Sequence, residues 1–145
     1  MPPFERYEPR VSAPLTHVVV FLHSGDYDRV HQGLSIAAAA VAAGRRVEIY
    51  LFWWALERFL NDALDEPDFM GREDVTDRFE SRGMPTLRAL LAHLNDSGLL
   101  TLAGCTGSLG ALGAEARADA SGIPLWLGWS AILQRTAGVT DRFYL

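Results

Sequence analysis

Short apolar runs alternate with stretches of helical periodicity along this sequence. The runs are rich in Val, Leu and Ile and are continuous rather than alternating, which is typical of strands buried on both faces of a parallel sheet. Four of them predict strands, over His17–His23, Val47–Trp53, Leu99–Ala103 and Ile123–Leu127. Arg142–Leu145 offers a further short strand at the end of the chain.

Between these runs, apolar residues recur every three to four positions and predict helices. The predicted helices cover Tyr27–Ala43, Ala55–Leu64, Thr86–Asn95, Leu109–Ala120 and Ser130–Thr136. Asp26 is placed to cap the first helix and Gly44 to end it. The segment Asp65–Pro85 is rich in acids and contains two prolines. Its apolar residues do not recur at helical or strand spacing, so we expect a long loop with at most a short helical turn.

Strands that alternate with helices indicate an α/β fold, because parallel neighbours need a crossover between them. We therefore predict a three-layer α/β/α sandwich around a mainly parallel sheet of about five strands. No linker divides the chain, so residues 1–145 are expected to form one domain. The first 14 residues carry four prolines and are expected to form an extended arm.

Composition excludes several classes of protein. The net charge is −5, and all 13 basic residues are Arg without a basic cluster, which argues against nucleic-acid binding. Without Lys there is no Schiff base and no P-loop. The exclusive use of Arg favours a GC-rich, bacterial source. No run approaches about 18 apolar residues, and residues 1–14 do not resemble a secretory signal, so a cytoplasmic protein without a membrane span is expected.

Neither a cofactor nor a metal is predicted. The turn Ser24-Gly25-Asp26 lacks the glycine pattern of nucleotide-binding loops, and its simplest role is to cap a helix. The residues His17, His31 and His93 are scattered without the spacing of metal ligands.

Candidate chemistry lies where the predicted strands end, because ligands of open parallel sheets bind outside the carboxyl ends of the strands. A thiol, a histidine, several hydroxyls and three tryptophans follow these ends. We take Cys105, Ser108 and His23 as catalytic candidates. The candidate substrate pocket comprises Ser24, Gly25, Asp26, Trp53, Trp54, Gly104, Thr106, Gly107 and Trp129.

The only cysteine of the chain, Cys105, lies between a predicted buried strand and a helix. Free N–H groups and the helix dipole favour an anion there, hence the nucleophilic thiolate. A small buried Cys that only packs is an equally good interpretation. Likewise His23 is either a base toward Cys105 or bound to the backbone, and the tryptophans line a pocket, fill a subunit contact or pack in the core.

Three blocks of the sequence resemble the DsrE/DsrF-like sulfur-relay family, and within it the peroxiredoxin-like branch. They are SGDYDR at Ser24–Arg29, VEIYLFWWAL at Val47–Leu56 and CTGSLGALG at Cys105–Gly113. In the third and most specific block, Cys105, Ser108 and Gly113 match the branch pattern. Trp53 and Ala55 stand where the branch has Phe and Gly, and Asp65–Pro85 lacks the Met-rich segment common in the branch.

The resemblance implies a three-layer α/β sandwich that forms homo- or hetero-oligomers. It also implies that Cys105 carries sulfur as a persulfide between a donor and an acceptor protein. Our leading hypothesis is therefore thiol-based sulfur transfer, with Ser108 stabilising the anion and His23 moving a proton. The alternatives are a non-catalytic binding module of the same fold and a thiol peroxidase-like protein. The apolar content of 49% and the family resemblance favour a homo-oligomer, a trimer or hexamer.

Overall fold

The computed structural model describes residues 17–145, so the predicted arm over residues 1–14 lies outside the described residues. A five-stranded sheet forms its centre, and every strand pair in it is parallel. The strands are β1 (Val18–Leu22), β2 (Val47–Leu51), β3 (Leu100–Cys105), β4 (Leu125–Leu127) and β5 (Asp141–Tyr144). The predicted α/β sandwich with about five parallel strands is confirmed.

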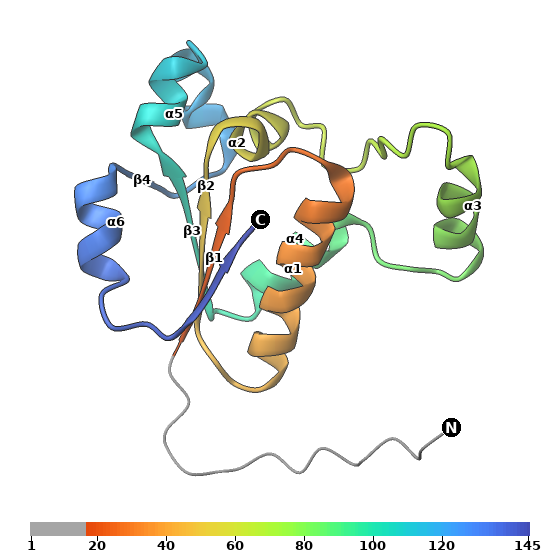
Figure 1. Ribbon diagram of the computed structural model, residues 1–145, viewed down its shortest axis with the longest axis horizontal. Helices are drawn as coiled ribbons and strands as arrows, with labels where there is room; N and C mark the ends of the chain where they lie inside the picture. Colours follow the sequence, from red (N-terminus) through yellow and green to blue (C-terminus); the bar gives the residue numbers. More distant parts are fainter. Residues whose placement is uncertain (1–16) are drawn as a thin grey trace.

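Six α-helices and two short 3₁₀ helices connect the strands. The α-helices are α1 (Tyr27–Ala42), α2 (Trp53–Leu60), α3 (Glu73–Ser81), α4 (Leu87–Asp96), α5 (Thr106–Ala111) and α6 (Trp129–Arg135). The 3₁₀ helices are η1 (Glu115–Arg117) and η2 (Asp119–Ser121). Figure 1 shows α1 and α4 on one side of the sheet, α6 on the other, and α2 and α5 beyond the upper ends of the strands.

The order of the strands is β4-β3-β2-β1-β5. The chain therefore moves in one direction from β1 to β4 and then returns to place β5 on the far side of β1. The direction of winding reverses between β1 and β5, and such a switch point is where open α/β sheets leave a crevice for ligands. The backbone N–H groups of His23 and Ser24 bind the carbonyl oxygen of Leu145 at 2.6 and 3.2 Å, which joins β5 to the loop after β1.

Alternate residues of each strand enter different cores, as the pleat requires. On one face, Val20, Leu22, Ile49 and Leu51 pack with α1, α2 and α4. On the other face, a smaller cluster covered by α6 holds Val19, Phe21, Tyr50, Phe52, Ala103, Cys105, Ile132 and Val139. The continuous apolar strands are thus buried on both sides, and the thiol of Cys105 belongs to the α6 face.

Two helix predictions are wrong. The segment Asp65–Pro85 contains the helix α3, in which no residue is fully buried and only Val75, Thr76 and Phe79 are half-buried. Its charges support it instead, because Asp74 lies in the first turn and forms an (i, i+4) ion pair with Arg78 at 2.9 Å. The helix predicted over Leu109–Ala120 instead ends at Ala111, because Gly113 has a left-handed φ of +61°.

Some observed element boundaries and caps also differ slightly from the predicted ones. Asp26 is the N-cap residue of α1, as predicted, but its carboxylate makes no cap hydrogen bond. The carboxylate of Asp68 accepts instead from the Tyr27 N–H, at 3.1 and 3.2 Å. The strand β2 ends at Leu51, and α2 already begins at Trp53.

His31 of α1 packs against the segment between α2 and α4 that contains α3. Its imidazole lies 6.4 Å from the ring of Tyr27 and 5.3 Å from that of Phe79, and its Nε2 atom is buried without a hydrogen-bond partner. Burial lowers the pKa of His31 below its usual 6.5. Folding therefore favours the neutral imidazole.

We expect this histidine to make the protein less stable in mild acid. As the pH falls below 6.5, the unfolded chain takes up a proton at His31 before the folded chain does, so the free energy of unfolding decreases. In His31→Phe the decrease between neutral pH and pH 5 is expected to be smaller than in the wild type, as measured by urea denaturation. The exposed His93 on α4 provides the control, and an unchanged pH dependence in His31→Phe would contradict the interpretation.

Candidate functional site

The predicted site residues gather at the carboxyl edge of the sheet. Cys105 ends β3, Trp53 and Trp54 follow β2, Trp129 follows β4 and Ser24 follows β1, all at the same edge. The helices α2 and α5 that follow β2 and β3 contact each other. At this edge the residues separate into three neighbouring groups, which we call the thiol group, the polar cavity and the aromatic cavity.

The thiol group surrounds Cys105, which is the N-cap residue of α5. Thr106, Gly107 and Ser108 form the first turn of that helix. An N-cap side chain ordinarily accepts from the second or third N–H of the helix, here those of Gly107 and Ser108. The Cys105 side chain makes no such bond. The residue is only 4% exposed and belongs to the α6-face cluster, while Ser108 is 3% exposed.

Open space nevertheless adjoins the sulfur. A Cβ atom placed on Gly107 would lie 3.7 Å from the Cys105 Sγ, an ordinary contact, and would meet no other atom within 4 Å apart from Thr106, Ser108 and the backbone of its own helix. Gly104, by contrast, packs directly against the Trp126 ring, which leaves no space for an added Cβ. The backbone of Gly107 therefore leaves room beside Sγ, whereas that of Gly104 is fully packed.

The neighbours of Cys105 follow from strand register. Cys105 pairs with Leu127 of β4, and Leu51 pairs with Gly104, so Phe52 comes next to Cys105. The strand β2 lies between β1 and β3. The backbone of His23 is therefore two strand spacings from that of Cys105, roughly 9–10 Å. Direct proton transfer between the two side chains has no support in this arrangement.

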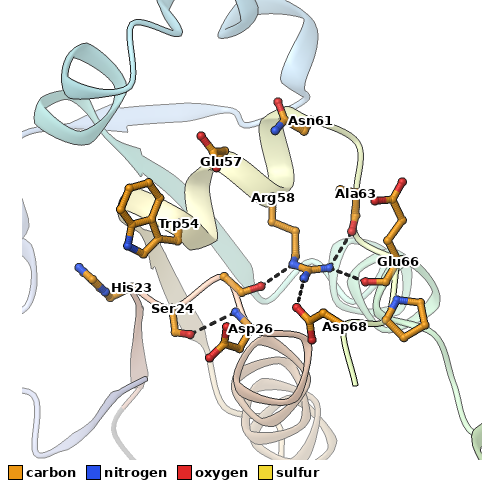
Figure 2. A pocket seen from close by; sticks show the side chains of 12 residues that line it. His23, Ser24, Asp26, Trp54, Glu57, Arg58, Asn61, Ala63, Glu66 and Asp68 are labelled. Atoms are coloured by element: carbon orange, nitrogen blue, oxygen red, sulfur yellow. Dashed lines mark hydrogen bonds and ion pairs between the residues drawn. The ribbon is translucent and has the colours of Figure 1, made fainter. Parts of the chain in front are cut away.

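The polar cavity has a volume of about 580 Å³. It brings together His23, Ser24, Gly25, Asp26 and Trp54 of the predicted pocket. The other lining residues come from the segment 57–68. Figure 2 shows Trp54 and His23 on one side of the cavity and Arg58 with Asp68 on the other. The Ser24 hydroxyl accepts from the Asp26 N–H at 3.1 Å, which shapes the turn after β1.

Arg58 organises the polar cavity, and the sequence did not single it out among the 13 arginines. Its guanidinium donates to the carbonyl oxygens of Gly25 at 2.6 Å, Ala63 at 2.9 Å and Glu66 at 2.8 Å. It also donates to the Asp68 carboxylate at 2.5 Å, and these four interactions converge on it in Figure 2. Arg58 thus joins the loop after β1 to the loop after α2. Only long-range contacts reveal this role.

The aromatic cavity, of about 370 Å³, lies at the switch point between β1 and β5. Its walls are Phe21, Phe52, Trp53, Trp129 and Tyr144, together with His23 and Leu145. Of the predicted pocket residues it holds Trp53 and Trp129. His23 borders both cavities. Sequence reasoning missed Phe21, Phe52 and Tyr144. A period-two pattern orders the residues of one strand only, and it is the pairing of β5 with β1 that brings Tyr144 beside Phe21.

Trp53 has an unusual backbone conformation, with φ at +42°. A bulky side chain rarely adopts the left-handed region, and strain of this kind costs about 1–3 kcal/mol. The residue stands at the junction of β2 and α2, where the chain leaves the sheet. This conformation places the indole of Trp53 in the wall of the aromatic cavity.

Within residues 17–145, no three side chains of His, Cys, Asp or Glu lie close enough to hold a metal ion together. Nor does any helix in that range have the length and apolarity to cross a bilayer. Comparisons with protein-family models and with curated proteins return no match.

Proposed function

We propose that this protein is a sulfur carrier in which Cys105 holds sulfur as a persulfide. The observation that carries the proposal is the placement of the thiol. It is the N-cap of a helix, makes no cap hydrogen bond of its own and has open space toward Gly107. The resemblance of the segment Cys105–Gly113 to sulfur-relay proteins supports the same role.

The chemistry requires no external oxidant. The Cys105 thiolate attacks the outer sulfur of a donor persulfide, the S–S bond of the donor breaks, and the donor leaves as a thiolate that takes up a proton. The new S–S bond joins Sγ to the transferred sulfur at about 2.05 Å. An acceptor thiolate then attacks the outer sulfur and releases Cys105, so electrons balance in both steps.

The first turn of α5 supplies the stabilisation in this proposal. In the proposal, the N–H groups of Gly107 and Ser108 donate to the sulfur once it is anionic, in the way that backbone donors stabilise an oxyanion. The burial of Cys105 in the α6-face cluster shields a labile persulfide from water. A donor reaches Sγ from the side that Gly107 leaves open.

The test is intact-mass spectrometry of the native protein after incubation with glutathione persulfide. The wild type is expected to gain one sulfur atom that dithiothreitol removes, and Cys105→Ser is expected to gain none. Ser108→Ala is expected to weaken loading by at most the roughly 1.5–3 kcal/mol of one hydrogen bond to a charged group. A wild type that gains no sulfur while folded would contradict the proposal.

Two glycines of α5 provide a matched pair for the same measurement. Gly107→Ala fills the space beside Sγ and is expected to slow loading about tenfold, the equivalent of a steric cost near 1.4 kcal/mol. Gly110→Ala adds a Cβ whose nearest neighbour is a Glu115 carboxylate oxygen at 3.7 Å, so it is expected to load normally. Equal rates in the two variants would show that the space beside Sγ is not used.

The second candidate is a non-catalytic, oligomeric binding module of the same fold, favoured by the 4% exposure of Cys105. A packed thiol resists iodoacetamide until the protein unfolds, whereas a sulfur carrier is alkylated in the native state. A thiol peroxidase would instead form a sulfenic acid with peroxide, and the chain has no second cysteine to resolve it. Alkylation and peroxide treatment, each read by mass spectrometry, separate the three functions.

A further inference from the structure

We propose that the aromatic cavity binds an uncharged, flat aromatic molecule of about two fused rings. The proposal goes beyond sulfur transfer and does not depend on Cys105, which does not line this cavity. The walls of the cavity, its charge and its position in the fold each point to this class of ligand.

The cavity has a buried floor and open walls. Phe21 and Phe52 form the floor, since they are 4% and 5% exposed. Trp129 and Tyr144 form the walls, and they are 49% and 66% exposed. Large aromatic side chains this exposed leave apolar area in water that a ligand would cover. A ligand that entered would therefore contact rings on several sides.

Four of the five aromatic residues that line the cavity, Phe21, Phe52, Trp129 and Tyr144, are stacked on one another. Tyr144 stacks on Phe21 with an interplanar angle of 7° and centroids 4.7 Å apart. Trp129 lies at 15° to Phe52 and at 21° to Phe21. Parallel faces favour a planar partner that continues the stack, because offset-stacked aromatic pairs are attractive beyond the area that they bury.

No side chain that lines the cavity is a carboxylate or a guanidinium. The neighbouring polar cavity, by contrast, contains Asp26, Glu57, Glu66 and the pair of Arg58 with Asp68. An ionic ligand in the aromatic cavity would lose its hydration without gaining a carboxylate or guanidinium side chain as a partner. The His23 imidazole at the rim can exchange a hydrogen bond with one polar atom of a neutral ligand. The expected ligand is therefore a neutral molecule with a single polar group.

The size and the position agree with a compact ligand. The volume of about 370 Å³ is at the lower end of the range of roughly 300–1,000 Å³ for small-molecule pockets. The cavity lies at the switch point between β1 and β5, where open α/β sheets bind their ligands. The strained backbone of Trp53 is maintained there, and it holds another ring against the cavity.

The probe is 2-naphthol, and binding is measured by isothermal titration calorimetry on the Cys105→Ser protein, so that a failure of sulfur transfer cannot affect the result. Two analogues test the class. 2-Decalol keeps the fused skeleton without planar rings, and naphthalene-2-sulfonate adds a charge. We expect 2-naphthol to bind about tenfold or more tightly than either analogue.

Two pairs of variants locate the site. Tyr144→Ala and Trp129→Ala are expected to weaken 2-naphthol binding about tenfold each, by removal of a stacking face. Phe143→Ala is the control for the strand, because Phe143 is adjacent to Tyr144 in β5 but lines a different cavity. Leu133→Ala is the control for α6, since Leu133 is exposed and outside the lining. All four side chains are exposed, and thermal melting verifies that each variant folds.

Three results would overturn the proposal. The first is no heat of binding with 2-naphthol at millimolar concentration. The second is equal affinity for 2-naphthol and 2-decalol. The third is self-association in sedimentation that Tyr144→Ala abolishes and 2-naphthol does not displace, which would assign this surface to a second copy of the chain.

Discussion

Replacing Arg58 with alanine is expected to lower the free energy of unfolding by about 3 kcal/mol. The Arg58 side chain is 11% exposed and donates four hydrogen bonds, three to backbone carbonyls and one to Asp68. Removal leaves those carbonyls without their donor. It also leaves the Asp68 carboxylate at the start of α1 without its cation. The Asp68 side chain is 42% exposed, so water takes up much of its charge, and most of the expected loss comes from the carbonyl hydrogen bonds of the buried guanidinium.

Urea denaturation measures the effect, and Arg72→Ala is the matched control. Arg72 is also paired with an aspartate, Asp74, but its side chain is exposed and the pair is screened by water. We expect no measurable loss of stability in the control. If Arg58→Ala were as stable as Arg72→Ala, the role of Arg58 in joining the loops after β1 and α2 would be wrong.

Gly25→Ala is expected to destabilise the protein by about 1–3 kcal/mol through overpacking. A Cβ atom at residue 25 would lie 2.7 Å from the carbonyl oxygen of Trp54 and 3.0 Å from its carbonyl carbon. These are backbone atoms and cannot rotate away. The start of α2 would have to move away from the loop after β1. This movement would also strain the hydrogen bond from Arg58 to the Gly25 carbonyl.

Gly128→Ala serves as the control at the same edge of the sheet. Its added Cβ would meet only the Thr106 hydroxyl, at 3.4 Å, and its φ of −90° suits any residue. Its melting temperature is expected to stay close to that of the wild type. A comparable loss of stability in both variants would indicate that the close approach of Trp54 to Gly25 is not the cause.

The apolar pattern predicted the parallel sheet correctly, because strands such as Val18–Leu22 are buried on both faces and read as continuous runs. The same reasoning failed for α3. That helix fully buries no residue, and the pair Val75 and Phe79 is too short an apolar pattern to distinguish it from a loop. The end of α5 was missed because Gly113 could equally have been a helical position until its left-handed φ was known.

The candidate site was only partly predictable. The rule of strand ends placed Cys105, Ser24 and Trp53 at one edge of the sheet. The rule did not show how far apart these residues lie, because that distance depends on which strands are neighbours in the sheet. The order β4-β3-β2-β1-β5 puts β2 between His23 and Cys105, and it creates the aromatic cavity beside β5.

By itself, the sequence determined those features of this protein that depend on neighbouring residues. They are the strands, the position of the α1 N-cap at Asp26, and the placement of the only cysteine between a strand and a helix. The tertiary structure decided what depends on contacts between distant residues. Arg58 reaches Gly25 across 33 positions, and Tyr144 stacks on Phe21 only because β5 pairs with β1. Such contacts form when the whole chain packs, and no local pattern encodes them.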